Sequence, residues 1–208
     1  MSFHPLMVYD PAKFQKSERA IVEEGPAFTL TPERRAQLDE ILTKYPPEHK
    51  RSAVLAALYL VQEQQGYLTG NAMKHIAPLV DLAPAEVEDV ATYYVMFFKE
   101  RVGKYVLQVC RTLSCALAGA ERVTEALSEK LGIGVGETDA SGMFTLLEFE
   151  CLGACDRAPV VMVNNEHWHE KASPESCSKL VDDIKARGID VLTGCHLRVE
   201  GVSMRNAE

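Results

Sequence analysis

The chain has 208 residues, of which 47% are hydrophobic and 25% are charged, as in an ordinary globular protein. Its 22 lysines and arginines are outnumbered by 30 aspartates and glutamates. This acidic balance argues against nucleic acid as a main partner, because phosphate binding needs clustered basic residues. No apolar run reaches the roughly 18–20 residues of a membrane helix, so we expect no direct membrane insertion.

The first half of the sequence predicts an extended arm followed by a helical domain. Residues 1–28 show no clear periodicity and are expected to form the arm. Four helical segments follow within residues 29–100. The first has Thr31 as its N-cap and Pro32 at its first position, and the second is closed by Gly66. The fourth starts at Pro84 and is expected to continue through "VMFFKE".

The second half predicts a small α/β domain over residues 101–188. "KYVLQVC" and "MFTLLEFEC" alternate as strands do, and "VVMVNNEHWHEKA" reads as two strands joined at Asn164-Asn165. Helical patterns occupy "AGAERVTEALSEKLG" and "SPESCSKLVDDIKARG". The order β-α-β-β-β-α indicates helices on a mixed sheet, which makes the fold class α/β. Residues 189–208 are expected to form a C-terminal tail.

Four of the six cysteines lie where predicted strands end. Cys110 and Cys115 are spaced Cys-x4-Cys, and after 35 residues Cys151 and Cys155 are spaced Cys-x3-Cys. Six cysteines without a secretion signal favour metal or redox chemistry over disulfides. Because neighbouring strands of an α/β sheet bring such loops together, the spacing predicts an all-cysteine metal site.

The spacing alone leaves the occupant of this site open. A [2Fe–2S] cluster takes two cysteines on each of two irons, which suits a wide cage. Structural zinc prefers knuckles with two to four intervening residues, so these gaps do not exclude it, and unligated thiols are the third possibility. A thiol–disulfide enzyme usually carries Cys-x-x-Cys, and that motif is absent from the sequence.

The strings around the cysteines carry a resemblance to a known family. "VCRTLSC" and "GVGETDASGMFTLLEFECLGACDRAPVVMVN" resemble the thioredoxin-like [2Fe–2S] ferredoxin subunit of NADH:quinone oxidoreductase (respiratory complex I). The resemblance extends over roughly residues 30–190. It implies an N-terminal helical bundle, then a thioredoxin-like domain with a small mixed sheet. The cluster ligands that it implies are Cys110, Cys115, Cys151 and Cys155.

The resemblance also implies a function. The chain would be the electron-transfer subunit of the NADH dehydrogenase module, and its cluster would accept a single electron from the FMN of a partner subunit. It would belong to an enzyme without having a catalytic residue or a complete active site of its own. Similar subunits occur in NAD-reducing hydrogenases and NAD-dependent formate dehydrogenases, so an equivalent place in either remains an alternative.

The cofactors and partners follow from the same resemblance. FMN and NAD are expected on the partner only, since "GIGVGE" lacks the last glycine of the dinucleotide motif and follows a helix. Besides this FMN- and NADH-binding subunit, we expect contacts with further subunits of the complex I peripheral arm. The protein would then be cytoplasmic, peripheral on the inner face of the bacterial inner membrane.

Other residues near the cysteines have two interpretations. Arg111 and Arg157 lie beside candidate ligands and either tune the reduction potential or face solvent. Backbone N–H groups of the cysteine loops, and the start of a helix near Ala118, are candidates to offset the negative charge of a cluster. Cys177 lies on an apolar helical stripe and is expected in the core.

Two further groups are expected to be structural. His167 and His169 share one face of a predicted strand, and a surface hairpin is the expected setting. The aromatic residues at the end of the fourth helix are expected to pack the two halves together: Tyr93, Tyr94, Phe97 and Phe98.

Overall fold

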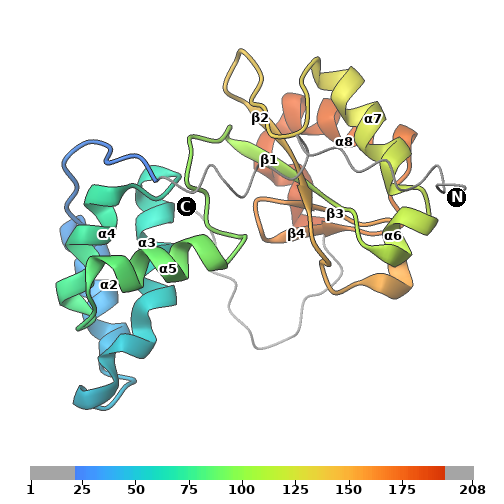
Figure 1. The fold of residues 1–208 in the computed structure, drawn as a ribbon. Coiled ribbons are helices and arrows are strands. Elements are labelled where there is room, and N and C mark those ends of the chain that lie inside the picture. The colour runs from blue at the N-terminus through green and yellow to red at the C-terminus, as the bar shows by residue number, and fades with distance from the viewer. Residues whose placement is uncertain (1–21, 195–208) are drawn as a thin grey trace, which may run out of the picture. The chain divides into compact units, whose positions relative to one another are not determined.

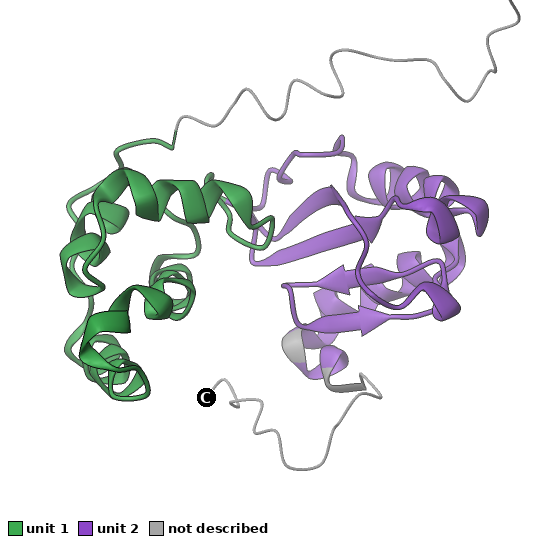
Figure 2. Ribbon diagram, turned by 60° about the horizontal axis from the view of Figure 1, so that its bottom comes forward, with its two compact units in different colours: residues 1–101 green, residues 102–208 purple. Residues whose placement is uncertain are grey.

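The computed structural model describes residues 22–194. The expected arm is therefore described only from Val22, and most of the expected tail lies outside the described residues. The described chain divides between Arg101 and Val102 into two units, which Figure 1 labels by element and Figure 2 distinguishes by colour.

The first unit is built from helices, as predicted. They are α2 (Pro32–Leu42), the 3-10 helix η3 (Pro47–Ala53), α3 (Val54–Gln65), α4 (Gly70–Ile76), the 3-10 helix η4 (Ala77–Leu79) and α5 (Pro84–Tyr93). Thr31 caps α2 by accepting a hydrogen bond from the backbone N–H of Arg34. Gly66 ends α3 with a φ of 89°, the left-handed conformation that glycine adopts without strain.

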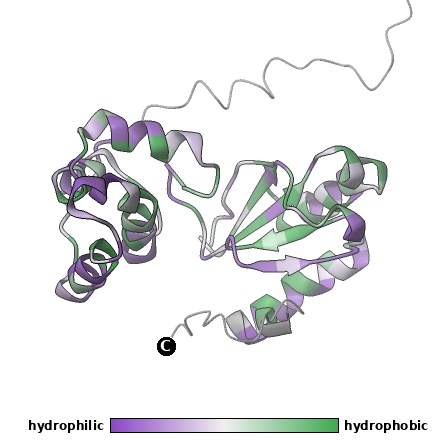
Figure 3. Cartoon of the chain, turned by 90° about the horizontal axis from the view of Figure 1, so that it is seen from below, coloured by the Kyte–Doolittle hydropathy of each residue, from purple (hydrophilic) through white to green (hydrophobic). Residues whose placement is uncertain are grey.

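The core of the first unit draws on each of the α-helices that the structure describes there. Fully buried side chains include Leu38 of α2, Leu58 of α3, Ile76 of α4 and Val87 of α5. Figure 3 shows hydrophobic and hydrophilic residues alternating along these helices, as amphipathic packing requires.

The end of α5 differs from the prediction. The helix stops at Tyr93, and Tyr94 has an extended backbone. Gln62 of α3 holds the following segment, since its side chain accepts from the N–H of Phe98 and donates to the carbonyl of Met96. Phe97 is thereby buried in the core of the first unit itself, so the predicted packing between the two halves is wrong for this residue.

The second unit contains the predicted small mixed sheet. Its strands, in the spatial order β2-β1-β3-β4, are β1 (Tyr105–Cys110), β2 (Phe144–Phe149), β3 (Val161–Val163) and β4 (His167–His169). β1 runs parallel to β2 and antiparallel to β3, which pairs antiparallel with β4. Asn164 and Asn165 turn the last hairpin with φ values of 55° and 60°, which asparagine tolerates better than most residues.

Helices complete the second unit. They are α6 (Leu113–Leu117), α7 (Ala120–Leu131), α8 (Pro174–Arg187) and the 3-10 helices η5 (Cys155–Arg157) and η6 (Gly188–Gly194). Alternate residues of β1, β2 and β3 share one hydrophobic core with α7 and α8. The predicted fold class, a helical bundle followed by an α/β domain with a mixed sheet, is confirmed.

The chain after Gly188 is more ordered than the sequence suggested. A tail was expected from residue 189, but η6 continues to Gly194. Leu192 is 1% exposed and belongs to the core of the second unit. The short segment "IDVL" has no periodicity that would reveal this burial, because a single apolar turn depends on its tertiary neighbours.

Candidate metal centre

The register of two parallel strands brings the two cysteine loops to the same edge of the sheet. Cys110, the last residue of β1, is paired with Phe149, the last residue of β2. The N–H of Arg111 then donates to the carbonyl of Phe149 at 2.9 Å. Both strands end at this point, so the first loop (residues 110–115, counted from the last residue of β1) and the second loop (residues 150–155) start side by side.

The first loop places one cysteine on the strand and one on a helix. Cys110 is 1% exposed at the end of β1, and Cys115 is 2% exposed on α6. The helix predicted near Ala118 is α7, which begins at Ala120. The short helix α6, which begins at Leu113 between the two cysteines, was not predicted.

The second loop is held by side-chain and backbone contacts. Trp168 of β4 donates its indole N–H to the carbonyl of Leu152 at 3.1 Å, and the N–H of Lys171 donates to the carbonyl of Arg157 at 2.7 Å. Gly153, with a φ of 80°, makes the turn between Cys151 and Cys155. Both of these cysteines are exposed, so the second loop presents its thiols to solvent.

The structure brings all four predicted cysteines together. Within the second loop, the Sγ atoms of Cys151 and Cys155 are 3.4 Å apart, and both are free thiols. Between the loops, Cys110 interacts electrostatically with Cys151 and Cys155, and Cys115 interacts with Cys155.

In each loop the first thiol is the more acidic. Burial by itself would raise the pKa of Cys110, but the hydroxyl and N–H of Thr112 and the N–H of Leu152 bond to its sulfur and lower that pKa. Thr112 Oγ1 is 3.3 Å from Cys110 Sγ. The pKa of Cys151 is lowered chiefly by the N–H of Gly153, 3.4 Å from its sulfur, and then by Cys155 and Thr112.

The second thiol of each loop retains its proton more strongly. Burial, followed by the hydrogen bond that its thiol donates to Cys110, raises the pKa of Cys115 to about 11. The hydrogen bond with Cys151, followed by the charge of that thiolate, raises the pKa of Cys155. Metal binding would therefore have to displace protons from Cys115 and Cys155, as is general for thiolate ligands.

The two arginines beside the cysteines are paired with carboxylates. Arg111 Nη2 lies 2.7 Å from Glu150 Oε1, and Arg157 contacts both Asp156 and Glu170 at 3.2 Å. All of these groups are at least partly exposed, so solvent screens their charges. The hydrogen-bond donors that reach the sulfurs belong instead to the loops themselves, and the Thr112 hydroxyl is the one that sequence reasoning missed.

The other candidates stay outside the centre. Cys177 is buried in the core on α8, as predicted. His169 lies on β4 of the predicted hairpin and is half-buried, and its Nε2 is buried without a hydrogen-bond partner among the described residues. Burial, followed by the charge of His167, lowers the pKa of His169 and keeps it neutral.

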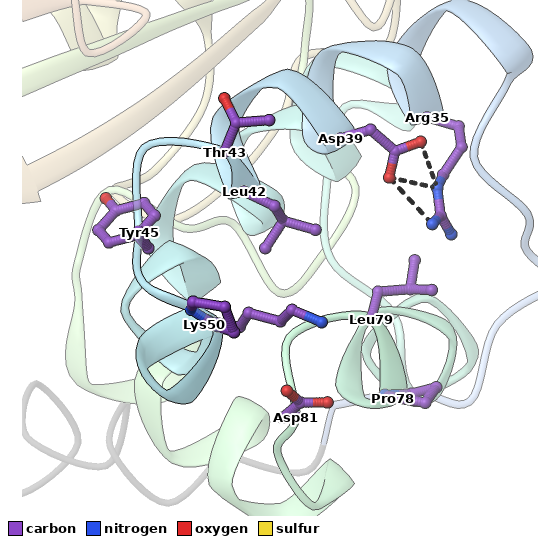
Figure 4. Close-up of a pocket in the computed structure, with 10 residues that line it drawn as sticks. Arg35, Asp39, Leu42, Thr43, Tyr45, Lys50, Pro78, Leu79 and Asp81 are labelled. Carbon is purple, nitrogen blue, oxygen red and sulfur yellow. Dashed lines mark hydrogen bonds and ion pairs between the residues drawn. The ribbon is translucent and has the colours of Figure 1, made fainter.

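A cavity of about 610 Å³ lies in the first unit (Figure 4). Its lining includes the ion pair between Arg35 and Asp39, together with Lys50 and Asp81. None of its described lining residues is a cysteine.

The donor set fits a [2Fe–2S] cluster. In the described part of the chain, no three Cys, His, Asp or Glu side chains are grouped so that they could hold a single metal ion. A [2Fe–2S] cluster makes a different demand, two thiolates on each of two irons, and each cysteine loop supplies two thiols. N–H donors aimed at Cys110 and Cys151 provide the hydrogen bonds that cluster sulfurs accept.

Comparisons with known proteins agree with this donor set. The family described as thioredoxin-like [2Fe–2S] ferredoxin matches residues 38–185. NADH-quinone oxidoreductase subunit 2 of Thermus thermophilus is 42% identical over 149 residues, which cover 72% of this chain and 82% of that protein. A subunit of NADH-quinone oxidoreductase from Rickettsia felis is 41% identical over 157 residues, with coverages of 75% and 93%.

A solved structure supports the fold. A NAD+-reducing [NiFe]-hydrogenase in the H2-reduced state superposes with a TM-score of 0.57 at 21% identity, over 66% of this chain and 23% of the hydrogenase chain. Among residues 22–194, no helix combines the length and apolar character needed to cross a membrane. The family match spans most of the chain and both units, and the curated relatives agree with it. This chain belongs to the thioredoxin-like [2Fe–2S] ferredoxin family.

Proposed function

We propose that the chain is the electron-transfer subunit of the NADH dehydrogenase module of NADH:quinone oxidoreductase, with one [2Fe–2S] cluster bound by Cys110, Cys115, Cys151 and Cys155. The observation that carries the proposal is the meeting of four free thiols from two loops at one sheet edge. The identity of about 40% to named subunits of this enzyme supports the choice of complex.

The residues of the centre have separate tasks in this proposal. A bound [2Fe–2S] cluster supplies reversible one-electron transfer. Cys110 and Cys115 anchor it on the buried side, whereas Cys151 and Cys155 hold the side that faces solvent. The N–H groups of Leu152 and Gly153 direct hydrogen bonds at the sulfurs and offset their negative charge.

The rest of the reaction is assigned to partners. The chain has no catalytic residue for NADH oxidation, and FMN and NAD belong to a neighbouring subunit that passes one electron to this chain. Further subunits of the peripheral arm complete its contacts, and the chain is peripheral on the cytoplasmic face of the membrane. The names of the relatives and the lack of a dinucleotide motif support this assignment.

A place in a NAD-reducing hydrogenase is the second candidate. The observation in its favour is the fold shared with the NAD+-reducing [NiFe]-hydrogenase. Isolation of the complex from its native source through a tag on this chain separates the two candidates. Co-purified subunits of a quinone-reducing complex would support a place in NADH:quinone oxidoreductase. A co-purified [NiFe] subunit would instead support a place in a hydrogenase.

The cluster itself is tested by metal and sulfide analysis of the purified chain with EPR spectroscopy after dithionite reduction. We expect about two irons and two sulfides per chain and an S = 1/2 signal in the reduced state. Zinc without sulfide would contradict the proposal.

The ligand set is tested by Cys155→Ser, with Cys177→Ser as the matched control. The first variant is expected to lose or distort the cluster, because it replaces one of the four thiols at the sheet edge. The second should keep the cluster, because Cys177 is buried among α8 core residues. An unchanged EPR spectrum in Cys155→Ser would remove that residue from the ligand set.

A further inference from the structure

Thr112 occupies a helix cap but does not use its side chain for capping. It is the N-cap of α6, where a threonine ordinarily accepts a hydrogen bond from an N–H two or three residues on. Its side chain makes no such bond. The hydroxyl oxygen instead lies 3.3 Å from the sulfur of Cys110.

The same hydroxyl also reaches the second cysteine loop. It contributes to the lowered pKa of the Cys151 thiol, in addition to its hydrogen bond with Cys110. Thr112 therefore contacts the sulfur of Cys110 and lies close enough to Cys151 to affect its thiol. The nearby hydroxyl of Ser114 is different, because the interaction seen for it is with Cys155, on the second loop.

The chemistry of the sulfurs fixes the direction of these bonds. In the free protein either the thiol or the hydroxyl can donate. A metal-bound cysteine is a thiolate and can only accept, so the threonine hydroxyl must then be the donor. Its methyl group has no part in such a bond.

We propose that Thr112 is a positioning residue for the cluster: its hydroxyl donates a hydrogen bond shared by the thiolates of Cys110 and Cys151, ties the two loops together and raises the reduction potential. This inference rests on the proposed function, since it concerns the group that these thiolates would hold.

The expected direction of the effect follows from charge. Reduction adds a negative charge, and a hydrogen bond to sulfur stabilises the more negative state more strongly. Removal of the hydroxyl should therefore disfavour reduction. We expect the ratio of reduced to oxidised cluster at a fixed potential to fall by up to about tenfold. For a one-electron couple this corresponds to a reduction potential that is more negative by about 59 mV.

The test compares Thr112→Val, which keeps the shape and removes the hydroxyl, with Thr112→Ser, which keeps the hydroxyl. Both full-length variants are purified with the wild type, analysed for iron and sulfide, and titrated by EPR-monitored reduction. We expect a more negative potential in the valine variant and a potential close to the wild type in the serine variant. Ser114→Ala, which removes the hydroxyl that interacts with Cys155, should shift the potential less than Thr112→Val does.

Each result decides the question. A valine variant with a full cluster at the wild-type potential overturns the inference. If the valine variant holds no cluster but the serine variant does, the hydroxyl is required and the inference stands. If both variants lose or shift the cluster alike, loss of the hydroxyl does not account for the effect and the inference fails. A wild-type chain without iron and sulfide would instead refute the proposed function itself.

Discussion

Hydrogen bonds from uncharged groups reach the sulfur atoms of the site, whereas the nearby charged side chains bond to one another. Arg111 and Arg157 are close in sequence to candidate ligands, yet each is bonded to carboxylates at the surface. An exposed ion pair contributes little and is screened by salt. The hydroxyl of Thr112 and the N–H of Gly153 lie within 3.3 Å and 3.4 Å of sulfur atoms and are fixed by the loops.

Cys177 gives a prediction about alkaline pH. It is 1% exposed, and burial raises the pKa of its thiol from an ordinary value near 9.0 to about 11. The folded protein then holds a proton that the unfolded chain releases above pH 9. The contribution of Cys177 to the free energy of unfolding is therefore fully present below pH 9 and is lost as the pH rises to about 11. Two pKa units correspond to about 2–3 kcal/mol.

The measurement is the free energy of unfolding in urea of the wild type and of Cys177→Ala at several pH values between 8 and 11. The alanine variant cannot ionise at this position, so the stability advantage of the wild type should narrow as the pH rises. Loss of protons from the other cysteines affects both proteins equally. If the difference in the free energy of unfolding between the two proteins stays constant over this range, the raised pKa of Cys177 does not affect stability and the prediction is wrong.

At the scale of elements, the parallel pairing of β1 with β2 is what assembles the centre. The strands end together at Cys110 and Phe149, so the loops that follow begin as neighbours. Any change that shifts β2 along β1 should therefore misplace Cys151 and Cys155 relative to Cys110. The start of this register depends on close backbone contact between Gly103 and the beginning of β2.

Gly103→Ala tests this dependence. A Cβ atom at Gly103 would lie 2.9 Å from backbone atoms of Met143 and Phe144, and backbone cannot move aside as a side chain can. The N–H of Gly103 also donates to the Thr145 hydroxyl. We expect a loss of about 1–3 kcal/mol in the free energy of unfolding, measured in urea.

Gly134→Ala is the matched control. The nearest atom to its Cβ would be the exposed carboxylate of Glu137 at 3.3 Å, the end of a flexible side chain. Its cost should stay within about 0.5 kcal/mol, as for most surface changes. Equal stability losses in the two variants would show that contact with β2 is not the cause.

The ends of helices and strands were predictable from the sequence where they depend on residues close by in the chain. Thr31 before Pro32, Gly66 after α3, and Asn164-Asn165 between two strands each act through neighbouring residues, and all three are found in place. The meeting of the cysteine loops was also expected, because strand ends of an α/β sheet converge.

Features that depend on distant partners were not predictable in this way. α5 ends at Tyr93 because Gln62, far back in the chain, holds the next segment by its side-chain amide. The contact from Trp168 to Leu152 and the burial of His169 likewise need the folded sheet. Thr112 carried the right chemistry, but nothing in "CRTLSC" shows that its hydroxyl would face two sulfurs.

At the scale of the molecule, each unit has a hydrophobic core of its own. The buried cluster of the first unit runs from Val22 to Phe97, and that of the second from Tyr105 to Leu192. All four cysteines belong to the second unit. We therefore propose that the two predicted domains, residues 29–100 and 101–188, are separate domains, with the second extended to include Leu192, and that the second alone contains what the cluster needs.

A truncated chain tests this division. Residues 102–208 expressed alone should fold cooperatively and bind about two irons and two sulfides, as expected for the whole chain, because the thiols and their N–H donors all lie beyond Val102. Urea unfolding followed by circular dichroism, together with iron and sulfide analysis, provides the measurement, and the full chain is the control. A fragment that stays unfolded, or that folds without binding iron while the full chain binds it, would show that the helical unit is required to build the centre.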